Sequence, residues 1–174
     1  VTFNVVTVAG DGEAGYRDGG SAIARFRSPV SVCFYGGVLY VFDDIQYSKI
    51  RMIDLATRTR TVTTLPFSGL PIDDIAVTSS TIYVAMRDHT IRAVDRTTKS
   101  VTTFAGSGEK GHADGVGRAA QFSFPYSLCF SPEDNSLIVG EYQNIRKIML
   151  ATSPLDVELE IPPSTFGQDM EKLF

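Results

Sequence analysis

The sequence predicts an all-β protein made of about three four-stranded sheets stacked face to face. Three observations carry this prediction: a repeat at an offset of 96 residues, short strand-like runs separated by turn residues, and no long helical period within the repeats. The 174 residues have an ordinary globular composition, with 43% hydrophobic and 21% charged residues. This composition excludes collagen, wholesale disorder and a small disulfide-dense scaffold.

The repeat is clearest in a glycine-rich stretch, residues 8–19, which returns as residues 104–115. The correspondence continues in the pairs Phe26 and Phe122, Pro29 and Pro125, Ser31 and Ser127, and Cys33 and Cys129. Because 96 is twice 48, a middle copy is expected, and residues 75–95 supply it without the glycine-rich insertion. We therefore predict a repeat body over residues 1–161, with copies at about 5–65, 66–104 and 105–161.

Each copy is predicted to contain short strands in the same order. In the first copy they are residues 30–34, 39–42, 50–53 and 61–65. The middle copy offers 75–77, 82–84 and 91–95, and the third offers 126–130, 137–139, 145–148 and 157–161. The second strand is apolar on both faces, so we expect a neighbouring sheet on each side of it. Blades of a β-propeller stack in this way.

Residues 5–9 are expected to form the outermost strand of a blade that precedes the first copy. Closed propellers usually have four to eight blades, and the sequence supplies about three. Either further blades are missing or this strand closes onto the last blade. We therefore expect the remainder of a larger propeller or a homodimer that joins three blades to three.

The residues resemble the NHL-repeat β-propeller family. The resemblance rests on the run Ala-Gly-x-Gly-Glu-x-Gly-x-x-Asp-Gly at 9–19 and 105–115, on Phe-x-x-Pro at 26–29 and 122–125, and on the pairs Ile50-Arg51, Ile91-Arg92 and Ile145-Arg146. It covers about residues 5–150. It implies a partial NHL-like propeller, and the style of the repeats is also similar to NHL-like ectodomains of parasite surface proteins. The location is otherwise undetermined, and this similarity favours an extracellular or cell-surface domain.

The glycine-rich stretches contain GxGxxG at 10–15 and 106–111, a pattern that binds dinucleotides when a helix follows a strand. Both copies carry a glutamate inside the loop, and no sustained helix follows. We interpret the two stretches as structural loops between blades, each with one helical turn before Phe26 or Phe122. The arginines of the Ile-Arg pairs are expected to anchor neighbouring loops by hydrogen bonds rather than to form a basic track.

The cysteines and histidines do not form a reactive pattern. Cys33 and Cys129 occupy equivalent positions in apolar strands, which favours buried, inert thiols, and a bridge between them is not expected across two blades. His89 and His112 lack the spacing of metal ligands and are expected to be solvated. We predict no catalytic residue, no metal and no cofactor.

The charge distribution bears on the partners. Residues 151–174 contain one of the 16 cations and five of the 20 anions, which leaves 15 of each in residues 1–150. A neutral body without a basic stripe makes nucleic acid an unfavoured partner. No apolar run is long enough to span a bilayer, so we expect a protein that is not embedded in a membrane.

The C-terminal residues 162–174 differ from the repeats. After two prolines, the spacing of Phe166, Met170, Leu173 and Phe174 predicts a short amphipathic helix with an acidic face. We expect it to pack on a blade or on an adjoining domain.

The sequence thus predicts a protein-interaction or ligand-recognition module that is not an enzyme. Its partner, a protein or a small ligand, is expected on the long loops, where Tyr16, Arg17, Lys110 and His112 break the glycine pattern. The alternative is part of a metal-dependent propeller lyase or hydrolase whose channel site is completed by missing blades.

Overall fold

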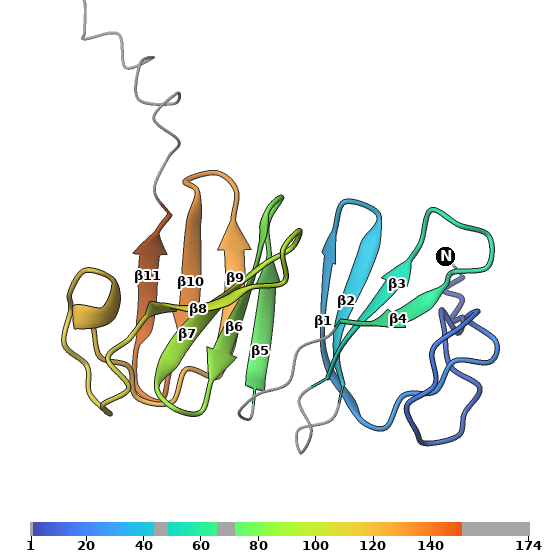
Figure 1. Ribbon diagram of the computed structural model, residues 1–174, viewed down its shortest axis with the longest axis horizontal. Helices are drawn as coiled ribbons and strands as arrows, with labels where there is room; N and C mark the ends of the chain where they lie inside the picture. The colour runs from blue at the N-terminus through green and yellow to red at the C-terminus, as the bar shows by residue number, and fades with distance from the viewer. Residues whose placement is uncertain (1, 44–48, 66–71, 151–174) are drawn as a thin grey trace, which may run out of the picture.

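The computed structural model describes residues 2–43, 49–65 and 72–150, and it is all-β (Figure 1). The first sheet runs β1 (Pro29–Tyr35), β2 (Val38–Asp43), β3 (Lys49–Asp54) and β4 (Val62–Thr64). The second runs β5 (Ile72–Val77), β6 (Thr81–Met86), β7 (Thr90–Asp95) and β8 (Val101–Ala105). The third contains β9 (Ser127–Ser131), β10 (Ser136–Gly140) and β11 (Ile145–Met149), and a 3₁₀ turn η1 (Gly117–Ala119) precedes it.

Every sheet is an antiparallel meander, because each strand pairs with the next strand in sequence. The predicted fold class, stacked blades of a partial propeller, is confirmed. The predicted fourth strand at 157–161 and the helix within 162–174 lie outside the described residues.

Two apolar layers hold the three sheets together. Between the first and second sheets, Tyr40 and Phe42 of β2 meet Ile75 of β5 and Val84 of β6. Between the second and third, the layer is made by the buried side chains Ala76, Tyr83, Ala85, Ile91, Phe122, Leu128, Leu137 and Val139. The residues 82–86 of β6 are all buried, as expected for a second strand covered on both faces.

Asp74 joins the innermost strands of the three sheets. Its carboxylate accepts hydrogen bonds from the Ser31 hydroxyl of β1, from the Leu128 N–H of β9 at 2.8 Å, and from the N–H of its neighbour Ile75 at 2.8 Å. A single carboxylate therefore fixes β5 to the strands on both sides, so the inner edge of the stack is held by polar as well as apolar contacts.

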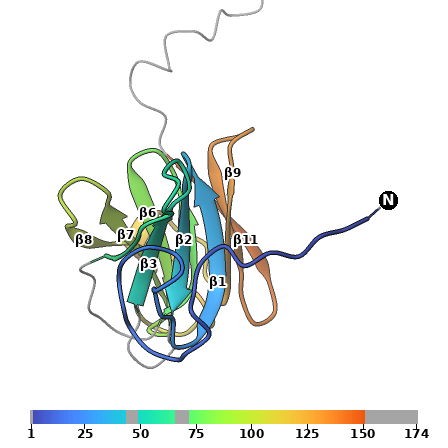
Figure 2. The same cartoon turned by 90° about the vertical axis from the view of Figure 1, so that its right-hand side faces the viewer.

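The N-terminal segment corrects one prediction. Residues 5–9 were expected to form a strand, but the structure places no strand there, and the segment extends away from the sheets (Figure 2). A strand needs a neighbour to satisfy its backbone groups, and in this chain no described strand lies beside the segment.

The cysteines correct a second prediction, that both thiols are buried. The two thiols are free, and no bridge between them was expected. Cys33 is half-buried, and this burial raises the pKa of its thiol. Cys129, however, is exposed rather than buried, because it lies on the face of β9 opposite Leu128, which packs on the second sheet.

Candidate functional site

Arg51 anchors the first glycine-rich loop to its sheet. The guanidinium donates to the carbonyl oxygens of Arg25 at 2.8 Å and Arg17 at 3.0 Å, and it forms ion pairs with Asp43 at 3.1 Å and Asp18 at 2.9 Å. The side chain is fully buried. One arginine thus closes the two ends of the loop onto β3.

Arg146 repeats this arrangement in the third sheet. It donates to the carbonyl oxygens of Gln121 at 3.1 Å and Ala113 at 3.3 Å, and it pairs with Glu141 at 3.1 Å and Asp114 at 2.6 Å. The predicted anchoring role of these arginines is confirmed. In the middle copy, which lacks the loop, Arg92 instead pairs with the nearby Asp88 at 2.7 Å.

The buried carboxylates behind these arginines were not identified from the sequence. Asp43 accepts from the backbone N–H groups of Arg27 at 3.0 Å and Ser28 at 2.8 Å, and Glu141 accepts from Ser123 N–H at 2.7 Å. The available signal was an acidic residue at or just after the end of the second strand in both copies. Burial by itself raises the pKa of Glu141, but hydrogen bonds from Ser123, Arg146, His112 and Asn144 outweigh it, so the pKa is lowered.

The first loop also closes onto β4, the fourth strand of its sheet. Asp18 accepts from the Thr64 N–H at 2.9 Å and from its hydroxyl at 2.8 Å, and Gly19 and Val62 exchange two backbone hydrogen bonds of 3.0 and 2.7 Å. Partial burial raises the pKa of Asp18, but its bonds to Thr64 and Arg51 dominate and lower it. The fourth strand is therefore held on both sides, by β3 and by the loop.

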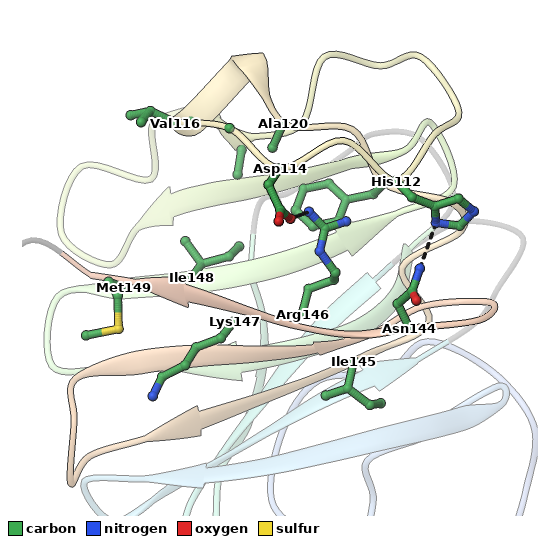
Figure 3. Close-up of a pocket in the computed structure, with 14 residues that line it drawn as sticks. His112, Asp114, Val116, Ala120, Asn144, Ile145, Arg146, Lys147, Ile148 and Met149 are labelled. Carbon is green, nitrogen blue, oxygen red and sulfur yellow. Dashed lines mark hydrogen bonds and ion pairs between the residues drawn. The ribbon is translucent and has the colours of Figure 1, made fainter.

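The third sheet has the loop but, among the described residues, no fourth strand. β11 is the last strand in the sheet order, and a groove of about 770 Å³ separates it from the loop that carries Asp114 and η1 (Figure 3). The Asp114 side chain is 95% exposed, whereas that of its equivalent Asp18 is 48% exposed. The groove therefore lies in the position that β4 fills in the first sheet.

The backbone groups that face this groove follow from the pairing in the first sheet. There, Asp54 N–H donates to Thr61 at 3.1 Å and the Ile50 carbonyl accepts from Leu65 at 2.8 Å, so the even-numbered residues of β3 face β4. Arg51 corresponds to Arg146, so the outward-facing residues of β11 are Ile145, Lys147 and Met149. The bond from Leu150 N–H to Asn135, at 3.0 Å on the inner side, agrees with this alternation.

Tyr16 and Arg17, two of the four predicted contact residues, lie on the first loop. The Lys49 ammonium stands 5.9 Å from the Tyr16 ring centroid, and the ring is partly exposed. The Arg17 guanidinium binds Asp11 at 2.7 Å and the carbonyl oxygen of Ile23, so it fastens the loop internally while about half of its side chain stays exposed.

Lys110 and His112 lie on the glycine-rich loop of the third copy, here called the third loop. Lys110 stands over the Phe124 ring, 5.1 Å from the centroid. His112 lines the groove, with Nδ1 2.9 Å from the Asn144 amide nitrogen and 3.3 Å from Glu141 (Figure 3). The two loops lie at opposite ends of the row of sheets, so the structure does not bring the four residues together (Figure 1).

His89, which was expected to be solvated, is half-buried. His89 packs edge-on against Phe124, with ring centroids 4.6 Å apart, and its Nδ1 accepts from the Phe124 N–H at 3.2 Å. It therefore supports the third loop. Across the described ranges, no three His, Cys, Asp or Glu side chains gather as a metal site would need, and no helix there is long and apolar enough to cross a bilayer.

Solved structures share this fold, although no family model and no curated protein matches the sequence. An auxiliary nutrient binding protein from Bacteroides thetaiotaomicron VPI-5482 aligns with a TM-score of 0.51 and 22% identity, over 67% of this chain and 36% of that one. The chain is propeller-like in fold. At this identity the likeness concerns the fold alone.

Two further structures align less well. A structural genomics protein of unknown function from the same organism has a TM-score of 0.46 and 14% identity, over 83% of this chain and 47% of that one. The N-terminal domain of Nup159 has a TM-score of 0.38 and 19% identity, over 78% and 34%. The propeller-like chain thus spans between a third and a half of the length of the structures that it matches.

Proposed function

We propose that the chain is a non-catalytic protein-interaction module of NHL-like blades, and that it receives an extended polypeptide strand along β11. One observation carries this proposal: none of the described residues fills the position beside β11, while β4 fills the same position in the first sheet. An open edge presents unpaired backbone groups, and adding a strand to such an edge is a common mode of protein recognition.

The groove has the chemistry that this mode requires. The outward N–H and C=O groups of Ile145, Lys147 and Met149 offer main-chain hydrogen bonds in the sense of the β3 to β4 pairing. On the opposite wall, Asp114 can accept from the N–H and the hydroxyl of an incoming residue, as Asp18 does from Thr64. Main-chain bonds would supply affinity, and the side chains of the groove would supply selectivity.

The long loops remain part of the proposal. His112 lines the groove directly, and we assign it contact with the incoming strand. We assign Tyr16, Arg17 and Lys110 contact with other surfaces of a partner, because each is at least partly exposed. An NHL-type origin and a place outside the cell or on its surface also belong to the proposal, supported by the repeat motif alone.

A peptide that copies the first sheet's own fourth strand tests the strand-accepting edge. The probe is a synthetic peptide of residues 59–65, which contains β4, added in excess to the chain at a concentration at which light scattering shows it to be monomeric. We expect the amide of Met149 to exchange with solvent about tenfold more slowly once the peptide is bound. Unchanged exchange at saturating peptide would contradict the proposal.

Lys147 offers a matched control. Lys147→Pro removes an outward N–H, and proline is tolerated at an edge strand when its missing N–H faces solvent. Lys147→Ala loses the same ion pair with Asp134 but keeps the N–H. Protection by the peptide should persist in Lys147→Ala and disappear in Lys147→Pro. Equal protection in both variants would place the peptide elsewhere.

A further inference from the structure

The N-terminal segment is a strand sequence without a sheet. Residues 2–7 are all exposed, and the side chains of Phe3, Val5 and Val6 are 88%, 99% and 73% exposed. β-branched and aromatic residues favour strands, and a run of them in solvent leaves apolar surface uncovered. The segment projects away from the first sheet (Figure 2).

The repeat identifies which strand this segment would form. Residues 5–10 correspond to residues 101–106 at the offset of 96, and residues 101–105 are β8, the fourth strand of the second sheet. β8 leads directly into the glycine-rich loop of the third copy, just as residues 5–9 lead into the glycine-rich loop of the first copy. The segment therefore has the sequence and the chain position of a fourth strand that belongs to a sheet preceding β1.

Within the described ranges, the third sheet has the complementary gap beside β11. The segment and β11 lie at opposite ends of the row of sheets, so the segment of one chain cannot reach the gap in the same chain (Figure 1). The segment of a second copy would not have this restriction. Such an exchange would be reciprocal, because each copy brings the same segment and the same gap among its described residues.

Exposed apolar side chains on β1 and on β11, at the two ends of the row of sheets, also fit a second copy of the chain as the partner. On β1, the side chains of Val30, Val32 and Phe34 are exposed on the face turned away from the second sheet. On β11, Ile145 and Met149 are exposed in the same sense at the other end of the row. In a propeller each such face packs on a neighbouring blade, so apolar faces at both ends fit a second copy better than solvent.

We infer that two copies join head to tail, and that residues 5–9 of each form the fourth strand of the other copy's third sheet. This inference rests on the proposed function of β11 as a strand acceptor and names its partner. The pairing of β7 with β8 sets the register: Ala93 opposite Thr102 corresponds to Lys147 opposite Val6. Each strand would thus add main-chain bonds at the outward residues of β11.

Solution mass with a matched pair of variants tests the inference. We expect a species of about 38 kDa, twice the 19.0 kDa of one chain, from micromolar concentrations upward. Val6→Pro removes the backbone donor opposite Lys147, at a residue that belongs to no described sheet, so its own fold should be unaffected. Val6→Ala keeps that donor. The pair should dissociate in Val6→Pro and Lys147→Pro and persist in Val6→Ala and Lys147→Ala.

The remaining outcomes separate failure of the pair from failure of the proposed function. A 19.0 kDa species at every concentration, with β11 still protected by the 59–65 peptide, overturns the pair and leaves the strand-accepting edge intact. A pair that survives Val6→Pro, or a species that keeps growing with concentration, also overturns it. If Met149 is protected in a monomer without peptide, and Glu158→Pro removes that protection, residues 157–161 of the same chain fill the gap. Both proposals would then be wrong.

Discussion

The first and third sheets carry the same arginine-anchored loop, but among the residues that the structure describes only the first sheet has a fourth strand on which that loop closes. Arg51 and Arg146 bind two loop carbonyl oxygens and two carboxylates each. Their side chains nevertheless differ in exposure, 0% for Arg51 and 14% for Arg146. The same anchoring contacts thus form in both loops, and the arginine and aspartate beside β4 are more deeply buried than their counterparts beside β11.

The largest expected difference concerns the arginines themselves. Arg51→Ala leaves Asp43 as a buried carboxylate without its ion pair, which should lower the free energy of unfolding by about 3–5 kcal/mol. Arg146→Ala should cost less, roughly 1–3 kcal/mol, because the Arg146 side chain is 14% exposed and Glu141 keeps a side-chain donor, Asn144, in addition to its backbone bond. Urea denaturation of both variants measures the two values. An equal or larger loss for Arg146→Ala would contradict the expectation that the buried Arg51 stabilises the protein more.

The glycines that begin the two loops should also differ. A Cβ on Gly106 would stand 2.5 Å from the His89 carbonyl oxygen, and its φ of +96° disfavours any side chain. Gly10 has a φ of +117°, but its nearest neighbour is Phe26 at 3.7 Å. We expect Gly106→Ala to lower the free energy of unfolding by about 2–3 kcal/mol and Gly10→Ala by about 1 kcal/mol. Thermal unfolding checks the ranking, and the reverse order would contradict the close backbone approach at Gly106.

Low pH should reduce the contribution of Glu141 to the stability of the folded state. Its folded-state pKa is lowered, so the ionised form favours the folded state; this contribution is fully present above the ordinary value of 4.5 and is lost as the pH falls through the folded pKa. At neutral pH, Glu141→Gln should cost about 1–3 kcal/mol. Denaturation at a series of pH values should show the difference between variant and parent shrinking below pH 4.5. A difference that stays constant down to pH 2 would exclude this role for the carboxylate.

The smallest contrast compares the loop aspartates. Asp18→Asn weakens the bonds to Thr64 that hold β4, and we expect a loss of about 0.5–1.5 kcal/mol. Asp114→Asn changes an exposed side chain that is ion-paired with Arg146, so a loss of about 0–0.5 kcal/mol is expected. Urea denaturation compares the two. Once a strand fills the groove, the loss in free energy of unfolding for Asp114→Asn should approach that for Asp18→Asn.

Much of the fold was predictable because the repeat fixes it. The strand runs at 39–42 and 82–84 are apolar on both faces, which predicted a sheet on each side of them. The structure confirms this for 82–84, whereas the second face of 39–42 packs on Ala24 and Phe26, which precede β1. The anchoring role of Arg51 and Arg146 was expected from the recurring Ile-Arg pair. In each case a local pattern repeated along the chain, so one copy tested the other.

What the sequence did not reveal depends on contacts between distant residues. Glu141 and Asp74 look like ordinary charged residues, and only the fold brings Ser123 N–H to the first and Leu128 N–H to the second. Residues 5–9 were wrongly predicted as a strand of this chain, because β propensity does not say whether a neighbouring strand is present.

Amide exchange at β3 and β11 in the dilute, monomeric chain tests the difference between the two sheets most directly. The account predicts slow exchange for Met52 and Asp54, whose N–H groups face β4, and fast exchange for Lys147 and Met149, whose N–H groups face the groove. Raising the protein concentration or adding the 59–65 peptide should slow the second pair only. If Lys147 and Met149 were as protected as Met52 and Asp54 in the monomer, the edge of β11 would be closed and the account contradicted.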